Sequence, residues 1–582
     1  MEKRVLLAIF LAFLVLYVWQ AVFVKPVPKP AAGPATTSAA SNIGRGAAPE
    51  KATTPPAASS PATPAVSQAT ALVSDASERD VRIETRDVVA TFTNRGARLK
   101  SWRLKHYFDQ QGLPQELIEN GIPSQPLPFT LRTASAAIDD TLNTALYTVG
   151  GAPDAPAVKS PVDLRFEYRD SAGLHAVKEF HLDPSSFILT FRSTISEGDR
   201  VLNPAILWGP AVGDIVENSR YVKKAEALFY QNDKVVRLSP AAIAKQASYE
   251  GEFSYVGVED NYFMAVALAP GTMKVSYQPV TVPQPAEVKD PPRELMAFTL
   301  EPKRSDVPIK FFTGPKDFDV LAAIDRDVVK AIDFGMFTVI VVPLLRSLKW
   351  VNGFVGNYGW SIIILTIIIN GIMFPLRHKG MVSMRKMQEI QPEVKVIQER
   401  YAKFKATDPA KQKMNQELMA LYKERGVNPA SGCVPMLLPM PVLLAMWALL
   451  STAIELRGAP FFGWIHDLST HDPYYVSPIL MGLTQVWQQR LTPAAGADPA
   501  QQKMMMFMPV VFTGMFLWAP AGLAIYYGTT NLWSIGQQYL ANHLVGPTRA
   551  RTIRPAAERR VKRVGGGKTD AASREEKDVH DE

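Results

Sequence analysis

Cysteine is almost absent from this chain of 582 residues, because Cys433 is the only one. A single cysteine excludes an intramolecular disulfide framework and any zinc site that needs two or more thiolates. Charge is missing from long stretches, since no Asp, Glu, Lys or Arg occurs in residues 351–376, 433–454, 473–489 and 504–540. Apolar runs of about 20 residues can cross the hydrocarbon core of a bilayer, so these absences exclude a purely soluble protein.

The N-terminal 77 residues form two segments of different composition. In residues 1–24, three charged residues precede an apolar run of about 20 residues that ends in bulky side chains. We interpret this segment as an uncleaved signal anchor with a cytoplasmic N-terminus, and a cleaved signal peptide is the alternative. Residues 25–77 are rich in Pro, Ala, Ser and Thr, which predicts a flexible tether.

Residues 78–330 alternate between apolar and polar side chains, as in Leu164-Arg165-Phe166, with turn signals between the runs. This pattern predicts a large antiparallel β-sandwich on the outer side of the inner membrane. We find no nucleophile elbow, no His-Glu-x-x-His and no phosphate loop in it. Residues 331–350 are apolar but include two basic residues, so we expect an amphipathic helix that lies at the bilayer interface.

Five further spans are predicted at residues 351–376, 433–454, 475–490, 504–518 and 522–540, which with the anchor makes six. Lys and Arg number twelve in residues 377–432 and ten in the tail 541–582, whereas residues 455–474 hold one. By the positive-inside rule, the first two segments and the short loop 491–503 are cytoplasmic and residues 455–474 are periplasmic. Both termini are then cytoplasmic. The net charge of +8 suits an anionic membrane surface or an RNA-containing partner.

Residues 377–432 are predicted to form a helical hairpin, because apolar residues recur every three or four positions. The first helix carries Met381, Met384, Met387, Ile390, Val394, Ile397, Tyr401 and Phe404 in one stripe. Asp408 followed by Pro409 predicts the start of the second, with Met414, Leu418, Leu421 and Tyr422 inward. The methionines either pack the hairpin or form a soft surface for varied apolar segments, with Met381, Met384 and Met387 as the candidate contacts.

Polar residues inside the predicted spans are the main functional lead, because they are energetically costly there. They are Thr366, Asn370, Thr484, Gln485, Gln488, Tyr526, Tyr527 and Asn531. Such groups either join helices by hydrogen bonds or line a shared polar cavity within the bilayer. Their occurrence on three predicted helices favours the cavity.

A second polar group, residues 466–472, includes two histidines and two aspartates in a short loop. The histidines lie five positions apart, which does not suit ligands on one helix face, so we expect a hydrogen-bonded turn and no metal. No cofactor is expected.

Several motifs carry a family resemblance, namely Asn428-Pro429, Gly432-Cys433-Val434-Pro435, Trp464-Ile465-His466-Asp467-Leu468 and Gln501-Gln502-Lys503-Met504. With them, residues 334–544 closely resemble the YidC/Oxa/Alb family of membrane-protein insertases, in its Gram-negative form with six spans. The resemblance implies a five-helix core around a groove, a periplasmic β-supersandwich, and nascent membrane proteins as clients. It also implies work alone or beside the SecYEG translocon. Membrane lipids are partners, and the basic hairpin and tail are candidate contacts for ribosomes and signal-recognition machinery.

One departure from the family concerns the groove. Members of this type usually carry an arginine where this chain has Asn370, and Arg377 follows two turns later on the same face. The candidate groove residues are Thr366, Asn370, Arg377, Gln485, Trp518, Tyr526 and Tyr527. We predict a non-enzymatic insertase and membrane chaperone. The alternative is a secondary transporter or channel, although the spans show no internal repeat and no acidic residue.

Overall fold

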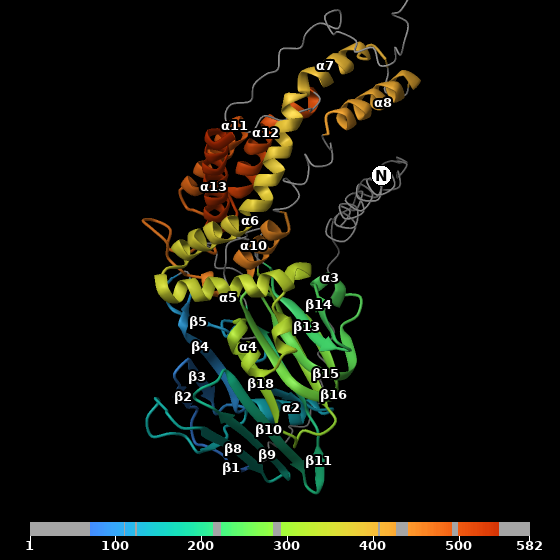
Figure 1. Ribbon diagram of the computed structural model, residues 1–582. Helices are drawn as coiled ribbons and strands as arrows, with labels where there is room; N and C mark the ends of the chain where they lie inside the picture. The colour runs from blue at the N-terminus through green and yellow to red at the C-terminus, as the bar shows by residue number, and fades with distance from the viewer. Residues whose placement is uncertain are drawn as a thin grey trace, which may run out of the picture. The chain divides into compact units, whose positions relative to one another are not determined.

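The computed structural model describes residues 70–109, 111–122, 125–212, 223–282, 293–404, 408–426, 440–491 and 499–545 (Figure 1). The predicted anchor and nearly all of the predicted tether and tail lie outside these ranges. The tether does not reach residue 77 as predicted, because β1 (Ala71–Val73) already pairs with a strand of the main sheet.

The β domain contains two antiparallel sheets. The main path of the larger sheet is β1, β8 (Val162–Asp170), β9 (Leu174–Leu182), β10 (Ile188–Glu197), β18 (Ile309–Pro315), β16 (Phe263–Val282), β15 (Ser248–Glu259), β13 (Glu226–Gln231) and β14 (Lys234–Leu238). Beside this path lie β6 (Thr130–Arg132), β7 (Thr148–Gly150), β11 (Arg200–Leu202), β12 (Ala205–Ala211) and β17 (Arg293–Pro302). The smaller sheet is β2 (Asp80–Glu84), β3 (Val88–Thr93), β4 (Arg98–Phe108) and β5 (Pro114–Glu116). Two short helices, α2 (Ala136–Thr144) and α3 (Pro240–Ile243), accompany the sheets.

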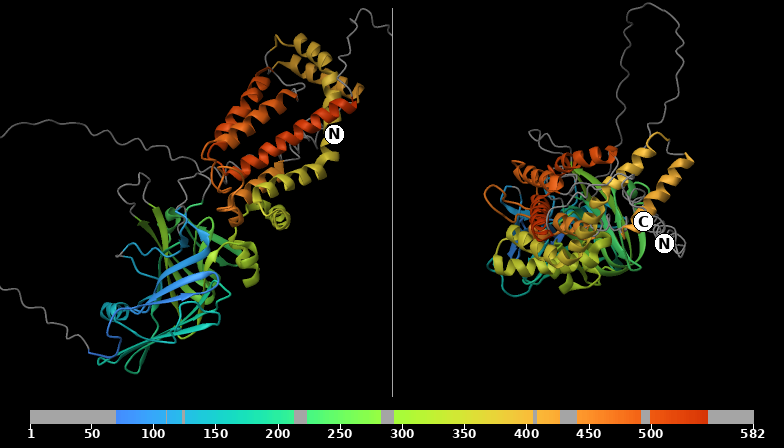
Figure 2. Two further views of the ribbon diagram at one scale, coloured as in Figure 1. Left: turned by 90° about the vertical axis from the view of Figure 1, so that its left-hand side faces the viewer. Right: turned by 45° about the horizontal axis from the view of Figure 1, so that its top comes forward.

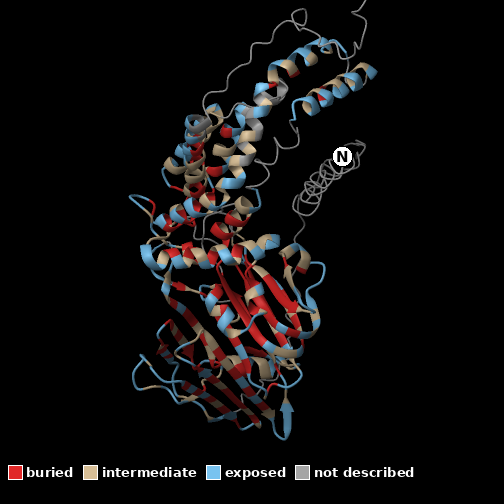
Figure 3. Ribbon diagram, in the orientation of Figure 1, coloured by how far each residue is buried: buried red, intermediate tan, exposed pale blue. Residues whose placement is uncertain are grey.

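The two sheets share one core. Alternate residues of β8 are buried, as the period of two predicts, and Figure 3 shows buried positions following the strands of the larger sheet. Trp102 of the smaller sheet donates from Nε1 to the carbonyl oxygen of Thr313 in the larger one, at 2.8 Å. Lys178 is fully buried and donates to the carbonyl oxygens of Gly96 and Phe129 at 2.6 and 2.8 Å. These polar contacts fix the register of one sheet on the other.

The helical part follows the β domain. Its elements are α4 (Phe318–Ile324), η1 (Val328–Ala331), η2 (Gly335–Phe337), α5 (Thr338–Val355), α6 (Tyr358–Glu389), α7 (Gln391–Arg400), α8 (Pro409–Glu424), α10 (Met440–Thr452), η4 (Ile454–Leu456), α11 (Val476–Leu491), α12 (Pro499–Phe516) and α13 (Ala521–Val545). Helices α11, α12 and α13 lie side by side, and α13 also packs on α6 (Figure 2). The predicted span 351–376 includes the end of α5 and part of α6, and the described parts of the other four predicted core spans lie mainly on α10, α11, α12 and α13.

The span predictions are recovered only in part. Among the described residues, two helical segments are long and apolar enough to cross a bilayer, Gly335–Val355 and Tyr358–His378. The apolar helices Met440–Thr452 and Met506–Phe516 are shorter, and the predicted first seven residues of the third span lie outside the described ranges. The six-span count therefore stays a prediction.

Helix α5 extends beyond the predicted interfacial segment, to Val355. Its buried residues Val341, Leu345 and Leu348 recur every three or four positions and pack in a cluster shared with the β domain. On the other face, Val339 and Phe354 are 85% and 75% exposed. This two-sided pattern is typical of an amphipathic helix, and the interfacial position of the segment stays a prediction.

The boundaries around the hairpin differ from the prediction. Helix α6 continues past residue 376 to Glu389, through Pro375, so the predicted first hairpin helix is divided between α6 and α7. Pro392 lies in the first turn of α7, where proline is favoured, and this explains the break after Ile390. Helix α12 likewise begins at Pro499, inside the predicted loop 491–503.

Candidate functional site

The polar face of α6 is buried at mid-helix. Thr366 is fully buried and its Oγ1 donates to the carbonyl oxygen of Ile362, at 2.6 Å. Asn370 is 2% exposed, and its Nδ2 donates to the carbonyl oxygen of Thr366, at 2.7 Å. With a helical rise of 1.5 Å per residue, Asn370 lies about 18 Å from the start of α6 at Tyr358. That distance is close to the middle of a bilayer core of about 30 Å.

Several buried polar atoms on the bundle helices lack a hydrogen-bond partner among the described residues. One is Oγ of Ser477 in the first turn of α11. The five farther along the helices are Oδ1 of Asn370 and Nε of Arg377 on α6, Oε1 of Gln485 on α11, and Nε1 of Trp533 and Nε2 of Gln537 on α13. A buried polar group without a partner costs about 1–3 kcal/mol. Trp533 and Gln537 were not among the predicted groove residues. The polarity of Gln537 within an uncharged run was the signal that could have found it.

Other polar residues of the spans join helices. Nδ2 of Asn531 on α13 donates to Oγ1 of Thr484 at 3.2 Å and to the carbonyl oxygen of Met481 at 3.3 Å, both on α11. These bonds explain Asn531 and Thr484 as interhelical contacts. Asn370 makes no such bond within the described part of the chain.

The aromatic candidates lie at different places. Tyr526 is buried in the helical core. The ring of Tyr527 contacts α12, with centroid distances of 6.0 Å to Phe512 and 5.6 Å to Phe516. Trp518 is 58% exposed in the turn between α12 and α13. The candidate residues are therefore spread along the bundle and do not form one cluster.

The loop between α10 and α11 is held by a buried aspartate. Asp472 is 1% exposed and accepts hydrogen bonds from Trp464 Nε1 at 2.9 Å and from the backbone nitrogens of Tyr474 at 3.0 Å and Ser477 at 2.7 Å. Within the described residues, no group of three or more His, Cys, Asp or Glu side chains could hold a metal ion. The Asp472 carboxylate therefore accepts hydrogen bonds from the backbone nitrogens around the start of α11.

Comparison with known proteins identifies the family. The family described as the 60Kd inner membrane protein matches residues 350–547, and the YidC periplasmic domain matches residues 80–347. The chain is 33% identical to the membrane protein insertase YidC of Geobacter metallireducens, over 95% of this chain and 100% of that protein. This chain belongs to the YidC family of membrane protein insertases. The YidC of Syntrophus aciditrophicus is 32% identical over 93% of this chain and 99% of its own length.

Family membership confirms the predicted resemblance and function. The protein is a membrane protein insertase of the inner membrane with a periplasmic domain, and it is not an enzyme. Among solved structures, an active YidC insertase with its first transmembrane domain resolved has 18% sequence identity and a TM-score of 0.34. That match covers 81% of this chain and 95% of the other.

The buried core of the hairpin in this YidC-family chain contains part of the predicted apolar stripe, whereas Phe404 is 44% exposed. Ile390, Val394 and Leu418 form its buried core, against which Met387, Ile397, Met414, Leu421 and Tyr422 pack. Ion pairs join α7 to α8, at 3.2 Å between Arg400 and Glu417 and at 2.5 Å between Arg425 and Glu393. Asp408 caps α8 by accepting from the nitrogen of Ala410, as predicted. The side chains of Met381 and Met384 lie outside the described ones.

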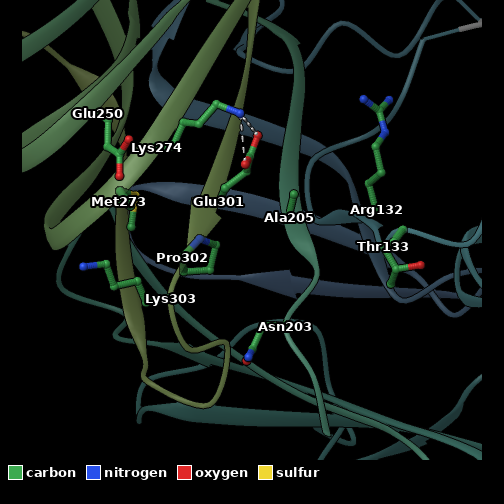
Figure 4. A pocket seen from close by; sticks show the side chains of 11 residues that line it. Arg132, Thr133, Asn203, Ala205, Glu250, Met273, Lys274, Glu301, Pro302 and Lys303 are labelled. Carbon is green, nitrogen blue, oxygen red and sulfur yellow. Dashed lines mark hydrogen bonds and ion pairs between the residues drawn. The ribbon is translucent and has the colours of Figure 1, made fainter. Parts of the chain in front are cut away.

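The periplasmic domain carries one open pocket of ≈ 510 Å³ in its described part, lined by Arg132, Asn203, Glu250, Lys274, Glu301 and Lys303 among others (Figure 4). Lys274 Nζ lies 3.0 and 3.2 Å from the two carboxylate oxygens of Glu301. Because this lysine and this carboxylate are paired with each other, the pocket offers no free acid–base couple from them.

Removal of the Asp472 carboxylate is expected to destabilise the loop between α10 and α11. Burial alone would raise the pKa of Asp472, but hydrogen bonds from Ser477, Tyr474 and Trp464 outweigh it and hold the pKa below the ordinary 3.8. The stabilisation is therefore present above that value and is lost as the pH falls through the lowered pKa. Asp472→Ala should lower stability by about 2 kcal/mol at neutral pH.

Thermal unfolding in detergent measures this effect, and the rate at which a protease cleaves the loop during heating reports the unfolding of the loop. Asp472→Asn is the matched control, because it keeps the shape and part of the accepting capacity and should lose less. Equal melting temperatures for the wild type and Asp472→Ala would contradict the assigned role.

Proposed function

We propose that α6, α11 and α13 line a hydrated polar groove within the bilayer, along which client proteins pass their polar flanks. An apolar client segment gains about 0.8 kcal/mol for each methylene that it buries in lipid. The obstacle is the polar flank, since a charged residue at the membrane centre costs about 3 kcal/mol or more. Polar groups that hold water halfway through the bilayer would lower this barrier.

The observation that carries the proposal is the set of unpartnered polar atoms on these three helices. Left dry, the five atoms would together cost about 5 to 15 kcal/mol. This is as large as the whole stability of a typical protein, which is about 5–15 kcal/mol. The simplest way to satisfy them is contact with water, or with the polar groups of a client.

Within this groove, the proposed contacts are Thr366, Asn370, Arg377, Gln485, Trp518, Tyr526 and Tyr527. Thr366 and Asn370 lie about 12 and 18 Å from the start of α6, on either side of the middle of a bilayer core of about 30 Å. The Asn370 amide can hold water there without the cost of burying a charge. Arg377 follows seven residues later on α6, which is about 10 Å toward the cytoplasmic end. A gradient from a neutral centre to a charged cytoplasmic end suits clients that arrive from the cytoplasm.

The proposal also includes the arrangement in the membrane. Both termini and the hairpin are cytoplasmic, supported by the twelve basic residues of 377–432 and the ten of 541–582. The methionines Met381, Met384 and Met387 then offer a soft surface to arriving clients. We further propose that the insertase works alone on small clients and beside the SecYEG translocon on larger ones. The basic hairpin and tail would meet ribosomes and signal-recognition machinery, and the apolar helices would meet lipid.

Accessibility to water tests the groove directly. In a Cys433→Ser background, the chain has no other cysteine, so single cysteines can be placed by Asn370→Cys and, as a matched control, Leu365→Cys. Leu365 lies on the same helix, is apolar and is 3% exposed, against 2% for Asn370. The two positions are therefore equally buried in protein. A maleimide reacts with a thiolate, which forms only where water solvates it.

We expect a membrane-impermeant maleimide added from the cytoplasmic side to label residue 370 at least about tenfold faster than residue 365. Equally slow labelling of both cysteines, in variants that still insert a client, would refute a hydrated groove at this depth.

A further inference from the structure

A buried charge cluster joins the β domain to the insertase helices. Nζ of Lys349 on α5 lies 3.3 Å from Oε1 of Glu455, 3.6 Å from Oδ2 of Asp317 and 2.5 Å from Oδ2 of Asp319. Glu455 belongs to η4, directly after α10, whereas Asp317 and Asp319 begin α4 at the end of the β domain. One lysine on α5 therefore connects α4, at the end of the β domain, with η4, whose Glu455 lies 106 residues later in the sequence.

Two of the three carboxylates are shielded from water, because the side chains of Glu455 and Asp317 are 7% and 16% exposed. Lys349 is 27% exposed, and Asp319, the third partner, is 65% exposed and lies at the rim of the cluster. Asp317 is fixed independently, because its Oδ1 accepts from the backbone nitrogens of Asp319 and Val320 at the start of α4. Removing one partner of such a buried pair leaves an uncompensated charge, unlike the loss of an exposed pair.

Neighbouring contacts seat the end of α10 in the β domain. Ile454 is 2% exposed and belongs to the β-domain core cluster. Arg457 donates from Nη2 to Oε1 of Gln115 at 2.8 Å and stacks over the ring of Phe263 at 5.0 Å. Asn261 donates from Nδ2 to the carbonyl oxygen of Ser451 at 3.1 Å. Helix α10 in turn packs on α5 and α13, so a shift of α10 would also shift its contacts with these helices.

We infer that Lys349 is a positioning residue for membrane insertion, which locks the periplasmic end of α10 to the β domain through Glu455, Asp317 and Asp319. In this arrangement the β domain acts as a clamp that sets the position of one helix of the insertase core. The inference concerns the rate of insertion itself, so it does not depend on whether the proposed groove is hydrated.

If the cluster served only to stabilise the fold, the insertion rate and the stability of the protein would change together with pH. Burial and the charge of Asp317 raise the pKa of Glu455 above the ordinary 4.5, against the opposing effect of Lys349. The other charged or titratable groups near the cluster are Asp319, Tyr107 of β4 and Tyr358 of α6. Because the raised pKa means that the folded protein favours protonated Glu455, acidification breaks the pair to Lys349 without destabilising the fold through this group.

The first experiment removes the charge of Lys349 in the full chain, reconstituted in vesicles of phosphatidylethanolamine and phosphatidylglycerol. Lys349→Met should slow insertion of a short single-span client by about tenfold, which is typical of coupling between sites. Lys349→Arg should restore most of the rate, because a guanidinium reaches the same carboxylates. Lys274→Met is the control, since it breaks an exposed pair with Glu301 and should insert at the wild-type rate.

The second experiment varies the pH of the vesicle interior, which the periplasmic domain faces. The wild-type rate should fall toward that of Glu455→Gln as the interior pH drops below neutral and approaches the raised pKa of Glu455, while Glu455→Gln should be slow at every pH. Over the pH range in which the wild-type insertion rate falls, the melting temperature of the wild type should not fall with it. Wild-type insertion by Lys349→Met, or a Glu455→Gln profile with the same pH dependence as the wild type, would overturn the inference. Equal losses in Lys349→Met and Lys349→Arg, matched by their melting, would assign the cluster to stability alone.

Discussion

Phe129→Ala should cost the β domain about 3–5 kcal/mol of stability. Phe129 is fully buried, and its ring centroid lies 4.6 Å from that of Phe191, 5.1 Å from those of Phe180 and Phe311, and 5.2 Å from that of Trp208. These four rings come from β10, β9, β18 and β12, so a single side chain fills the centre of the larger sheet's core. Truncation leaves a cavity that the rigid strands cannot close.

Backbone geometry gives this prediction a second, finer part. Phe129 has a φ of 67°, a left-handed conformation that costs about 1–3 kcal/mol for a residue other than glycine. Phe129→Gly relieves this strain while opening the same cavity, so it should destabilise the domain less than Phe129→Ala. Denaturant unfolding of the full chain in detergent, followed by tryptophan fluorescence, measures both.

The control for this pair is Phe108→Ala at the end of β4, where the phenylalanine is 53% exposed. Its loss should change stability by no more than about 0.5 kcal/mol. If Phe129→Ala unfolded at the same denaturant concentration as Phe108→Ala, the ring cluster would not be the centre of the core.

Features with a short sequence period could be predicted from the sequence. The alternation in residues such as 162–170 predicted strands, and the stripe through Ile390 and Val394 predicted which face of the hairpin is buried. The start of α8 at Asp408-Pro409 was also predictable, because a cap and a proline act within one turn. In each case the determining residues are neighbours in the chain.

Features that depend on distant residues could not be predicted. The sequence shows Asn370 and Asn531 alike as polar residues inside predicted spans, and only the packing of α13 on α11 gives Asn531 its partner Thr484. Lys349 counted only as a charge that disfavours a span, because its partner Glu455 lies 106 residues away. The continuation of α6 through Pro375 was missed because proline usually ends a helix.

Asn370→Leu is expected to slow insertion by about tenfold for a client with an acidic translocated flank, and much less for one with a neutral flank. Leucine has a similar size but neither donates nor accepts, so it removes the unpartnered Oδ1 that would hold water at mid-membrane. Asn370→Arg should be tolerated, because a guanidinium in a wet groove open to the cytoplasm stays solvated. Paired clients that differ only in the flank measure the effect.

Stability separates this role from interhelical bonding. Within the described residues, Asn370 bonds only its own helix, through the carbonyl oxygen of Thr366, so Asn370→Leu should melt close to the wild type. Asn531→Leu is the matched control, since it breaks the bonds from α13 to Thr484 and Met481 of α11. It should lower the melting temperature and slow both clients equally, because it weakens the bundle and not the groove.

The same substitution, Asn to Leu, is thus expected to have opposite effects on client discrimination and stability at the two positions. Asn370→Leu should discriminate between clients at nearly constant stability, whereas Asn531→Leu should lose stability without discriminating. If Asn370→Leu inserted both clients at the wild-type rate, or if Asn370→Arg failed to fold, the unpartnered amide would not belong to a hydrated path. Polar flanks would then have to pass along the other unpartnered atoms of the bundle, which belong to Arg377, Gln485, Trp533 and Gln537.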